Sequence, residues 1–140
     1  MRWDAVIPGQ PVSLNDSIRM GKLGVQRKGR PVLNVDGSQK VITRPVKTEQ
    51  AKRYQADAQL ILQAAKPSHF SPTGQLRVTF DIELDHDMDS DNIVKPLCDA
   101  LKRAIVYDDI HFLPCVRSKK AVRGTRLPFV LMTIEEVEDV

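Results

Sequence analysis

A strand that runs into a cluster of aspartates is encoded by 76-LRVTFDIELDHDMDSDN-92. Alternate positions of its first half are apolar, which predicts a strand with one buried face: Leu76, Val78, Phe80, Ile82 and Leu84. Every second residue after the strand is an aspartate: Asp85, Asp87, Asp89 and Asp91. This crowding of acids in a chain of net charge +3 requires an explanation.

A helix is predicted directly after the aspartates. Proline belongs in the first turn of a helix, so Pro96 indicates a helix start close to Asn92. Asp89 and Asp91 then lie in the strand-to-helix turn, where the positive end of the helix dipole favours negative charge. The core face of this helix follows a spacing of three and four residues: Ile93, Leu97, Ala100, Leu101, Ala104 and Ile105.

The remaining segments complete a small α+β domain. Residues 2–7 read as a strand, and 32-VLNVDGSQKVIT-43 reads as a hairpin with its turn at Asp36-Gly37. A second helix is expected from the N-cap Thr48 to the stop at Pro67. Further strands are predicted near residues 116–122 and 129–137. We therefore expect one domain over residues 1–140, with two main helices packed on a small mixed sheet whose neighbours are mostly antiparallel.

Composition narrows the class of protein. The 140 residues suffice for a single core. The longest apolar runs are too short to cross a bilayer, and the N-terminus lacks the pattern of a secretory signal. Two cysteines, Cys98 and Cys115, make neither a disulfide framework nor a zinc site. These features predict a cytoplasmic protein with no membrane contact and no organic cofactor.

Charge is distributed unevenly along the chain. Residues 81–91 hold six acids and no base. Residues 17–47 hold eight basic residues against one acid, and residues 117–126 hold five against none. The candidate contacts to an anionic partner are taken from these two basic segments: Arg27, Lys28, Arg30, Lys119, Lys120 and Arg123. A solvated charged face is the ordinary explanation of each run taken alone, and an anionic partner is the alternative.

Converging carboxylates need solvent or a cation between them. Oxygen ligands without a Cys or His cluster favour Mg²⁺, Mn²⁺ or Ca²⁺. Lys95 lies one helical turn after Asp91, and a short helix could return Asp108 and Asp109 to the first acids. Acids with a nearby lysine suit metal-assisted phosphoryl transfer.

Structural roles account for each feature separately. Asp85 and Asp87 could continue the polar face of the strand, and Asp91 or Asn92 could serve only as an N-cap. Lys95 could pair with Asp91 or Asp99, and the Asp108-Asp109 pair could form a polar turn. An EF-hand fits Asp87, Asp89 and Asp91 at its first ligand positions, but it then requires Gly at Asn92 and Glu at Cys98. The sequence therefore disfavours an EF-hand.

The segments 89-DSDNIVKPLCDAL-101 and 106-VYDD-109 resemble the signature of the RusA family of Holliday junction resolvases. The opening segment 7-IPGQPVSLN-15 is also similar to that family. The resemblance implies a homodimeric, Mg²⁺-dependent endonuclease, with Mn²⁺ as a substitute, that nicks two opposed strands of a four-way DNA junction. Such enzymes are often encoded by prophages.

The resemblance also implies residue roles. Asp89, Asp91 and Asp109 correspond to the metal-binding carboxylates, and Lys95 to the catalytic lysine. Asp108, Asn92 and Asp99 match the motif as supporting residues. The basic segment between Asn15 and Thr48 is longer than in the family, so it suggests an arm that grips DNA or strengthens a dimer.

Two other functions stay open at this point. One is a DNA- or junction-binding module without cleavage activity. The other is a protein that binds Ca²⁺ only for stability, which would not require the basic segments. Intact acids and an intact lysine favour the enzyme.

Overall fold

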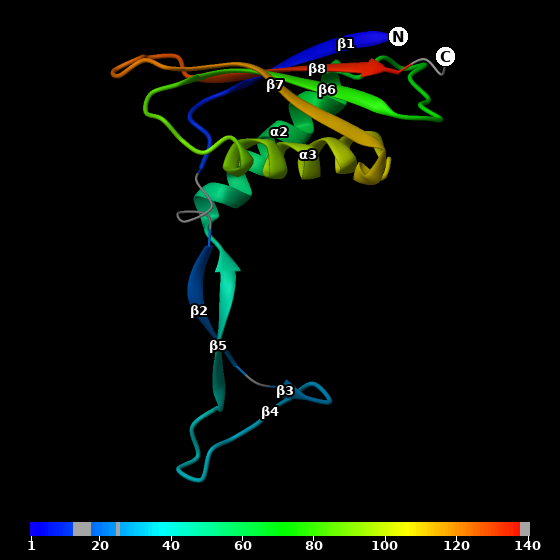
Figure 1. Cartoon of the computed structure of the whole chain (residues 1–140). Helices are drawn as coiled ribbons and strands as arrows, with labels where there is room; N and C mark the ends of the chain where they lie inside the picture. Colours follow the sequence, from blue (N-terminus) through cyan, green and yellow to red (C-terminus); the bar gives the residue numbers. More distant parts are fainter. Residues whose placement is uncertain (13–17, 25, 138–140) are drawn as a thin grey trace.

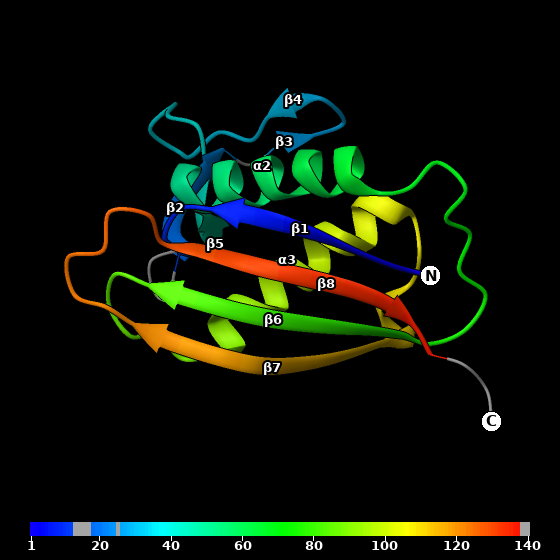
Figure 2. The same ribbon diagram turned by 90° about the horizontal axis from the view of Figure 1, so that it is seen from above.

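The computed structural model describes residues 1–12, 18–24 and 26–137. Side chains are described for all of these residues except those of the two strands 18–24 and 41–47. Four strands form one mixed sheet in the order β1-β8-β6-β7 (Figure 2). Their bounds are β1 Arg2–Pro8, β6 Leu76–Leu84, β7 Phe112–Ala121 and β8 Phe129–Glu136. The predicted strands are confirmed, although β7 begins four residues earlier than expected.

One pairing differs from the expected antiparallel arrangement. β8 runs antiparallel to both β1 and β6, but β6 and β7 are parallel neighbours. A helix, α3 (Asp91–Ile105), connects these two strands. Parallel neighbours need such a crossover, because the chain must return to the end of the sheet where the first strand began.

Two helices cover one face of the sheet, and Figure 1 shows them in a single layer beneath it. They are α2 (Glu49–Ala65) and α3. The apolar face of β6 and the predicted core face of α3 are buried between the layers. The predicted α+β fold, with two helices on a mixed sheet, is therefore confirmed.

The start of α2 agrees with its sequence. Thr48 is the N-cap, and its Oγ1 accepts a hydrogen bond from the Ala51 N–H at 3.3 Å. Gln55 is a polar residue of α2 but is buried. Its Nε2 donates to the carbonyl oxygen of Pro96 in α3 at 3.2 Å. A polar residue is thus used at the contact between the two helices.

A long hairpin extends from the body (Figure 1). β2 (Ile18–Gly24) pairs antiparallel with β5 (Val41–Lys47), and a small hairpin of β3 (Gln26–Arg27) and β4 (Arg30–Pro31) lies at the far end. We call residues 18–47 the arm. The turn predicted at Asp36-Gly37 is present, with Gly37 at φ 88°. The two sides of the predicted hairpin are also joined, by hydrogen bonds from the Asn34 N–H to the Ser38 carbonyl and from the Lys40 N–H to the Val32 carbonyl. They form an isolated bridge between Leu33 and Gln39 rather than two regular strands, and the long partner of β5 is β2.

Within the described residues, neither the length nor the hydropathy of any helix suits a membrane span.

Candidate active site

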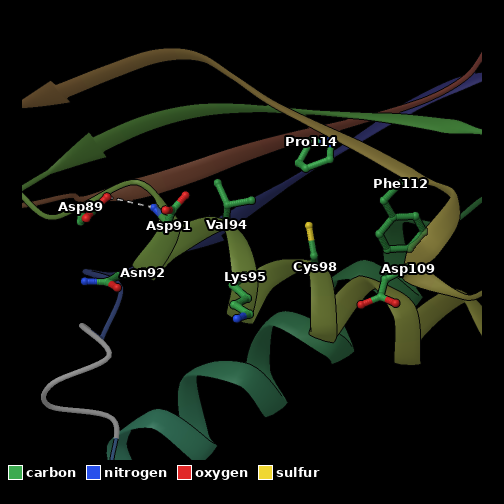
Figure 3. A pocket seen from close by; sticks show the side chains of 9 residues that line it. All are labelled: Asp89, Asp91, Asn92, Val94, Lys95, Cys98, Asp109, Phe112 and Pro114. Atoms are coloured by element: carbon green, nitrogen blue, oxygen red, sulfur yellow. Dashed lines mark hydrogen bonds between the residues drawn. The ribbon is translucent and has the colours of Figure 1, made fainter.

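A groove of about 600 Å³ runs along α3 and the start of β7 (Figure 3). All four predicted catalytic residues line it: Asp89, Asp91, Lys95 and Asp109. Side chains from α3 and β7 complete the lining: Asn92, Val94, Cys98, Phe112 and Pro114. The groove therefore gathers acids and one lysine from both ends of α3.

Asp89 and Asp91 stand together at the start of α3. Asp91 is the first residue of the helix, and its backbone N–H donates to Asp89 Oδ1 at 3.3 Å. Both residues are exposed. Ser90 occupies the N-cap position without a capping hydrogen bond from its side chain. Asp89 thus accepts an N–H of the first turn, and the Asp91 carboxylate makes no side-chain hydrogen bond or ion pair within the described chain.

The helix start near Asn92 is confirmed, but Pro96 is not in the first turn. Pro96 is the sixth residue of α3. Because proline has no N–H, the Asn92 carbonyl four residues earlier lacks its usual helical donor. Asn92 lines the groove.

Asp85 and Asp87 do not extend a strand face, because β6 ends at Leu84. Asp85 Oδ1 accepts from the Gly124 N–H at 3.0 Å, and Asp87 pairs with Lys119 at 3.3 Å. The prediction that both continue the strand is wrong. They hold the loop between β6 and α3 against β7 and the segment that follows it.

Gln10 holds the same loop from the other side. Its Oε1 accepts from the Asp85 N–H at 2.7 Å, and its Nε2 donates to the His86 carbonyl and to Met88 Sδ, each at 3.3 Å. The Met88 side chain is buried. The residues just before Asp89 are therefore fixed by contacts with a distant part of the chain.

Lys95 shares one side of α3 with Asp91 and Cys98. These positions are four and three residues apart, which places them on one helical stripe. The Lys95 side chain is exposed and forms no ion pair with any described residue. The structure therefore does not support the alternatives in which Lys95 pairs with Asp91 or with Asp99.

Asp109 lies at the other end of the groove, in η1 (Asp109–His111) (Figure 3). Its carboxylate pairs with Lys102 at 3.6 Å. It also lies close enough to Cys98 to raise the pKa of that thiol. Cys98 is seven residues after Asp91, a rise of about 10 Å along the helix.

The expected return of Asp109 to the first acids is thus not found in the described chain. No three acidic, histidine or cysteine side chains are grouped there closely enough to hold one metal ion. Asp89 and Asp91 are adjacent, but the turn after α3 leaves Asp109 two helical turns away along the groove. The predicted metal set of Asp89, Asp91 and Asp109 is therefore not assembled within one chain.

Asp108 has a structural role. Its Oδ1 accepts from the Ile110 N–H at 3.2 Å and so caps η1. This hydrogen bond is the main reason that the pKa of Asp108 lies below its usual value. Asp108 does not line the groove.

Cys98 is part of the groove wall. Burial, with smaller contributions from Asp99 and Asp109, raises the pKa of its thiol to about 12. A neutral thiol is a poor ligand for a hard cation. Cys98 is therefore a packing residue, as the helical pattern indicated, and Asp99 is a half-buried neighbour outside the groove lining.

The predicted DNA-contact residues fall into two groups. Arg27, Lys28 and Arg30 lie at the β3–β4 hairpin and line a second hollow. Lys119 instead contacts the loop between β6 and α3. It forms an ion pair with Asp87 and donates a hydrogen bond to the Met88 carbonyl at 3.0 Å. Lys120 and Arg123 are exposed and have no ion pair within the described chain.

Sequence patterns do not reveal Gln10, Gly124, Phe112 or Pro114 as residues of the site or its support. The segment 7-IPGQPVSLN-15 contains Gln10, but its partners lie far along the chain. Asn15, at the end of that segment, lies outside the described residues.

The family model for the endodeoxyribonuclease RusA matches residues 25–128, most of the 140-residue chain. The chain belongs to the RusA family. The match includes the β3–β4 hairpin, both helices and the whole groove. RusA proteins are endodeoxyribonucleases that act on Holliday junctions, so membership supports a nuclease with branched DNA as its partner. No curated protein matches the chain.

Proposed function

We propose that this RusA-family protein is a metal-dependent, structure-selective endonuclease that resolves four-way DNA junctions by paired nicks, acting as a homodimer. The observation that carries the proposal is the groove, which holds Asp89, Asp91 and an unpaired Lys95 within two turns of one helix. Family membership supplies the class of reaction and of DNA.

The residues at the start of α3 fit a divalent metal. Asp89 and Asp91 are adjacent, exposed carboxylates, and no basic side chain of the described chain neutralises either one. Mg²⁺ commonly uses one or two protein carboxylates and takes its other ligands from water and substrate phosphate. Asp89 and Asp91 would therefore hold Mg²⁺, or Mn²⁺ in its place, without a third acid.

A bound metal would polarise the scissile phosphate and lower the pKa of a coordinated water. The chain's own residues supply the remaining functions. The anchored loop before α3 fixes Asp89 relative to Asp91, and the Lys95 ammonium lies one turn further along the same groove wall. In hydrolysis the water oxygen bonds to phosphorus and the phosphorus–oxygen bond to the leaving strand breaks. Lys95 stabilises the negative charge that develops on the phosphate oxygens.

The test uses the full chain and a synthetic four-way junction with opposed strands labelled separately. With Mg²⁺ or Mn²⁺ we expect paired nicks in opposed strands and little cutting of a linear duplex of the same sequence. Asp91→Asn should reduce the cutting rate by about a thousandfold or more while keeping junction binding, since it removes a metal-binding charge with almost no change in shape.

Direct metal binding gives a second readout. Titration with Mn²⁺ without DNA should show binding that Asp91→Asn weakens strongly, while Asp109→Asn and the exposed helix variant Asp57→Asn keep it. Equal cutting by Asp91→Asn and wild type would refute the site. Junction binding without cutting under either metal would favour a non-cleaving module.

A further inference from the structure

The arm places a basic cluster away from the groove. The arm joins the body at the start of α2, because β5 ends at Lys47 and the next residue, Thr48, is the N-cap of that helix. Seven residue pairs join β2 to β5, from Ile18 with Lys47 to Gly24 with Val41. Figure 1 shows this ladder leading away from the helices, with the β3–β4 hairpin beyond it. A ligand of the hairpin would therefore extend past the body of the protein.

The hairpin brings like charges together. Arg27 and Arg30 are directly paired across β3 and β4. Lys28 and Gly29 form the turn between them, at φ 53° and 76°. Directly opposed like charges destabilise a strand pair. Three exposed cations around a two-residue turn therefore favour the binding of an anion.

The arm does not neutralise these cations itself. Asp36 is the single acid among residues 26–40, and its Oδ1 accepts from the Ser38 N–H at 2.9 Å and from Ser38 Oγ at 2.6 Å. Within the described chain, none of Arg27, Lys28 and Arg30 forms an ion pair. The charge of the hairpin is thus available to a ligand.

The shape and composition of the hairpin suit a phosphate backbone. A hollow of about 530 Å³ is lined by Arg27, Lys28, Arg30, Pro31 and Val32. Residues 18–47 contain no aromatic side chain, so base stacking has no platform there. Arginine pairs with phosphate oxygens through two parallel N–H groups, and such contacts position nucleic acid without reading its sequence.

We propose that the β3–β4 hairpin is a second DNA-binding site, which binds backbone phosphates of a duplex arm outside the catalytic groove. The proposal rests on the proposed function for its choice of DNA as the polyanion. It assigns the arm to substrate binding, and the outcome in which the arm serves only to join two copies of the chain is tested separately.

The test measures binding without divalent metal, so that it does not depend on cutting. Affinity for a four-way junction is measured over a series of salt concentrations for wild type and for the Arg27→Ala, Arg30→Ala double variant. The variant should bind about tenfold more weakly near 0.1 M salt, and its slope of log affinity against log salt should fall by about 2, roughly 0.9 for each lost phosphate contact. The Arg2→Ala, Arg53→Ala variant removes the same charge from exposed sites outside the arm and should keep the wild-type slope.

A second series of measurements varies the length of the four DNA duplexes of the junction. The affinity of the wild-type protein should fall when the duplexes of the junction are shortened to the width of the groove. The affinity of the double variant should not change with duplex length. A conservative Arg27→Lys, Arg30→Lys protein should recover most of the slope, because it keeps the charge. If the lysine variant does not recover the slope, the loss of positive charge is not the cause of the weaker binding by the alanine variant.

The proposal is overturned if the double variant matches wild type both in the slope of log affinity against log salt and in the dependence of affinity on the length of the DNA duplexes. It is also overturned if the variant binds DNA normally but loses self-association in sedimentation. Failure of the proposed function would appear differently, as an absence of nicks in the presence of metal while the hairpin effect on binding persists.

Discussion

Lys95 differs from two other lysines of this molecule in the contacts that its side chain makes. Lys102 and Lys119 each pair with a carboxylate, whereas Lys95 lines the groove without such a partner in the described chain. An unpaired ammonium beside two acids is available to a substrate phosphate. Its position one turn after Asp91 is consistent with a role in stabilising the transition state rather than with a structural ion pair.

Replacement of Lys95 tests that role. Lys95→Ala should lower the single-turnover cutting rate about a hundredfold to a thousandfold, the usual effect of removing one preorganised group that stabilises developing charge. Junction affinity and Mn²⁺ binding should change little, and Lys95→Arg should recover part of the rate. Arg103→Ala, an exposed cation of the same helix outside the groove, is the matched control. An equal loss of binding and cutting would instead make Lys95 a simple DNA contact.

The aspartate run shows which roles a sequence can predict at the level of residues. The apolar spacing of α3 separates Asp89 and Asp91 from the earlier acids, because it indicates a helix start near Asn92. The roles of Asp85 and Asp87 could not be predicted, since their partners Gly124 and Lys119 come from distant segments. Local periodicity contains no information about such contacts.

At the level of elements, the loop between β6 and α3 acts as a support for the site. Gln10 makes three hydrogen bonds to it, to backbone groups of Asp85 and His86 and to Met88 Sδ. The loop has no regular secondary structure of its own over residues 85–89. Its geometry, and with it the position of Asp89, therefore depends on these contacts.

Gln10→Ala should expose that dependence. We expect a loss of about 1 kcal/mol in the free energy of unfolding, because exposed and part-buried groups of the loop lose hydrogen-bond partners. Cutting and Mn²⁺ affinity should both fall, although Gln10 does not line the groove. Asp87→Ala, which breaks an exposed ion pair in the same loop, should have a much smaller effect on both. Thermal unfolding and Mn²⁺ titration provide the measurements, and unchanged Mn²⁺ affinity in Gln10→Ala would exclude a positioning role.

Elements with strong periodicity could be predicted, and those defined by distant pairing could not. The alternation in β6 and the three-and-four spacing in α3 correspond directly to their buried faces. The strand β2 was missed because Gly21 and Gly24 interrupt any alternation in that segment. The parallel pairing of β6 with β7 depends on how α3 returns the chain, which hydrophobic patterns do not encode.

At the level of the whole molecule, opposite charges are kept apart. The acids Asp89 and Asp91 lie at the start of α3, and the cations Arg27, Lys28 and Arg30 lie at the far end of the arm. A metal site needs its negative charge uncompensated by protein cations, whereas a polyanionic substrate needs nearby positive charge. Under the proposed function, cations mounted on an arm would meet both requirements.

The predicted homodimer follows from the need for paired nicks. In the described chain, Asp89 and Asp91 form one pair of carboxylates in one groove, so one chain supplies one candidate centre for cutting. In the proposed homodimer, each chain would cut one of the two opposed strands. We expect sedimentation to give twice the mass of the 15.8 kDa chain at micromolar concentration.

A mixed dimer tests this arrangement most directly. Co-expression with two affinity tags yields dimers in which one subunit carries Asp91→Asn, and these should nick one strand of a junction and leave the opposed strand intact. The matched dimer with Asp57→Asn in one subunit should nick both strands, since Asp57 is an exposed residue of α2 outside the groove. Strand-specific labels distinguish the products on a denaturing gel. Paired nicks from the Asp91→Asn mixed dimer would show that one groove cuts both strands in turn, and a monomeric wild-type protein that makes paired nicks would remove the need for a dimer.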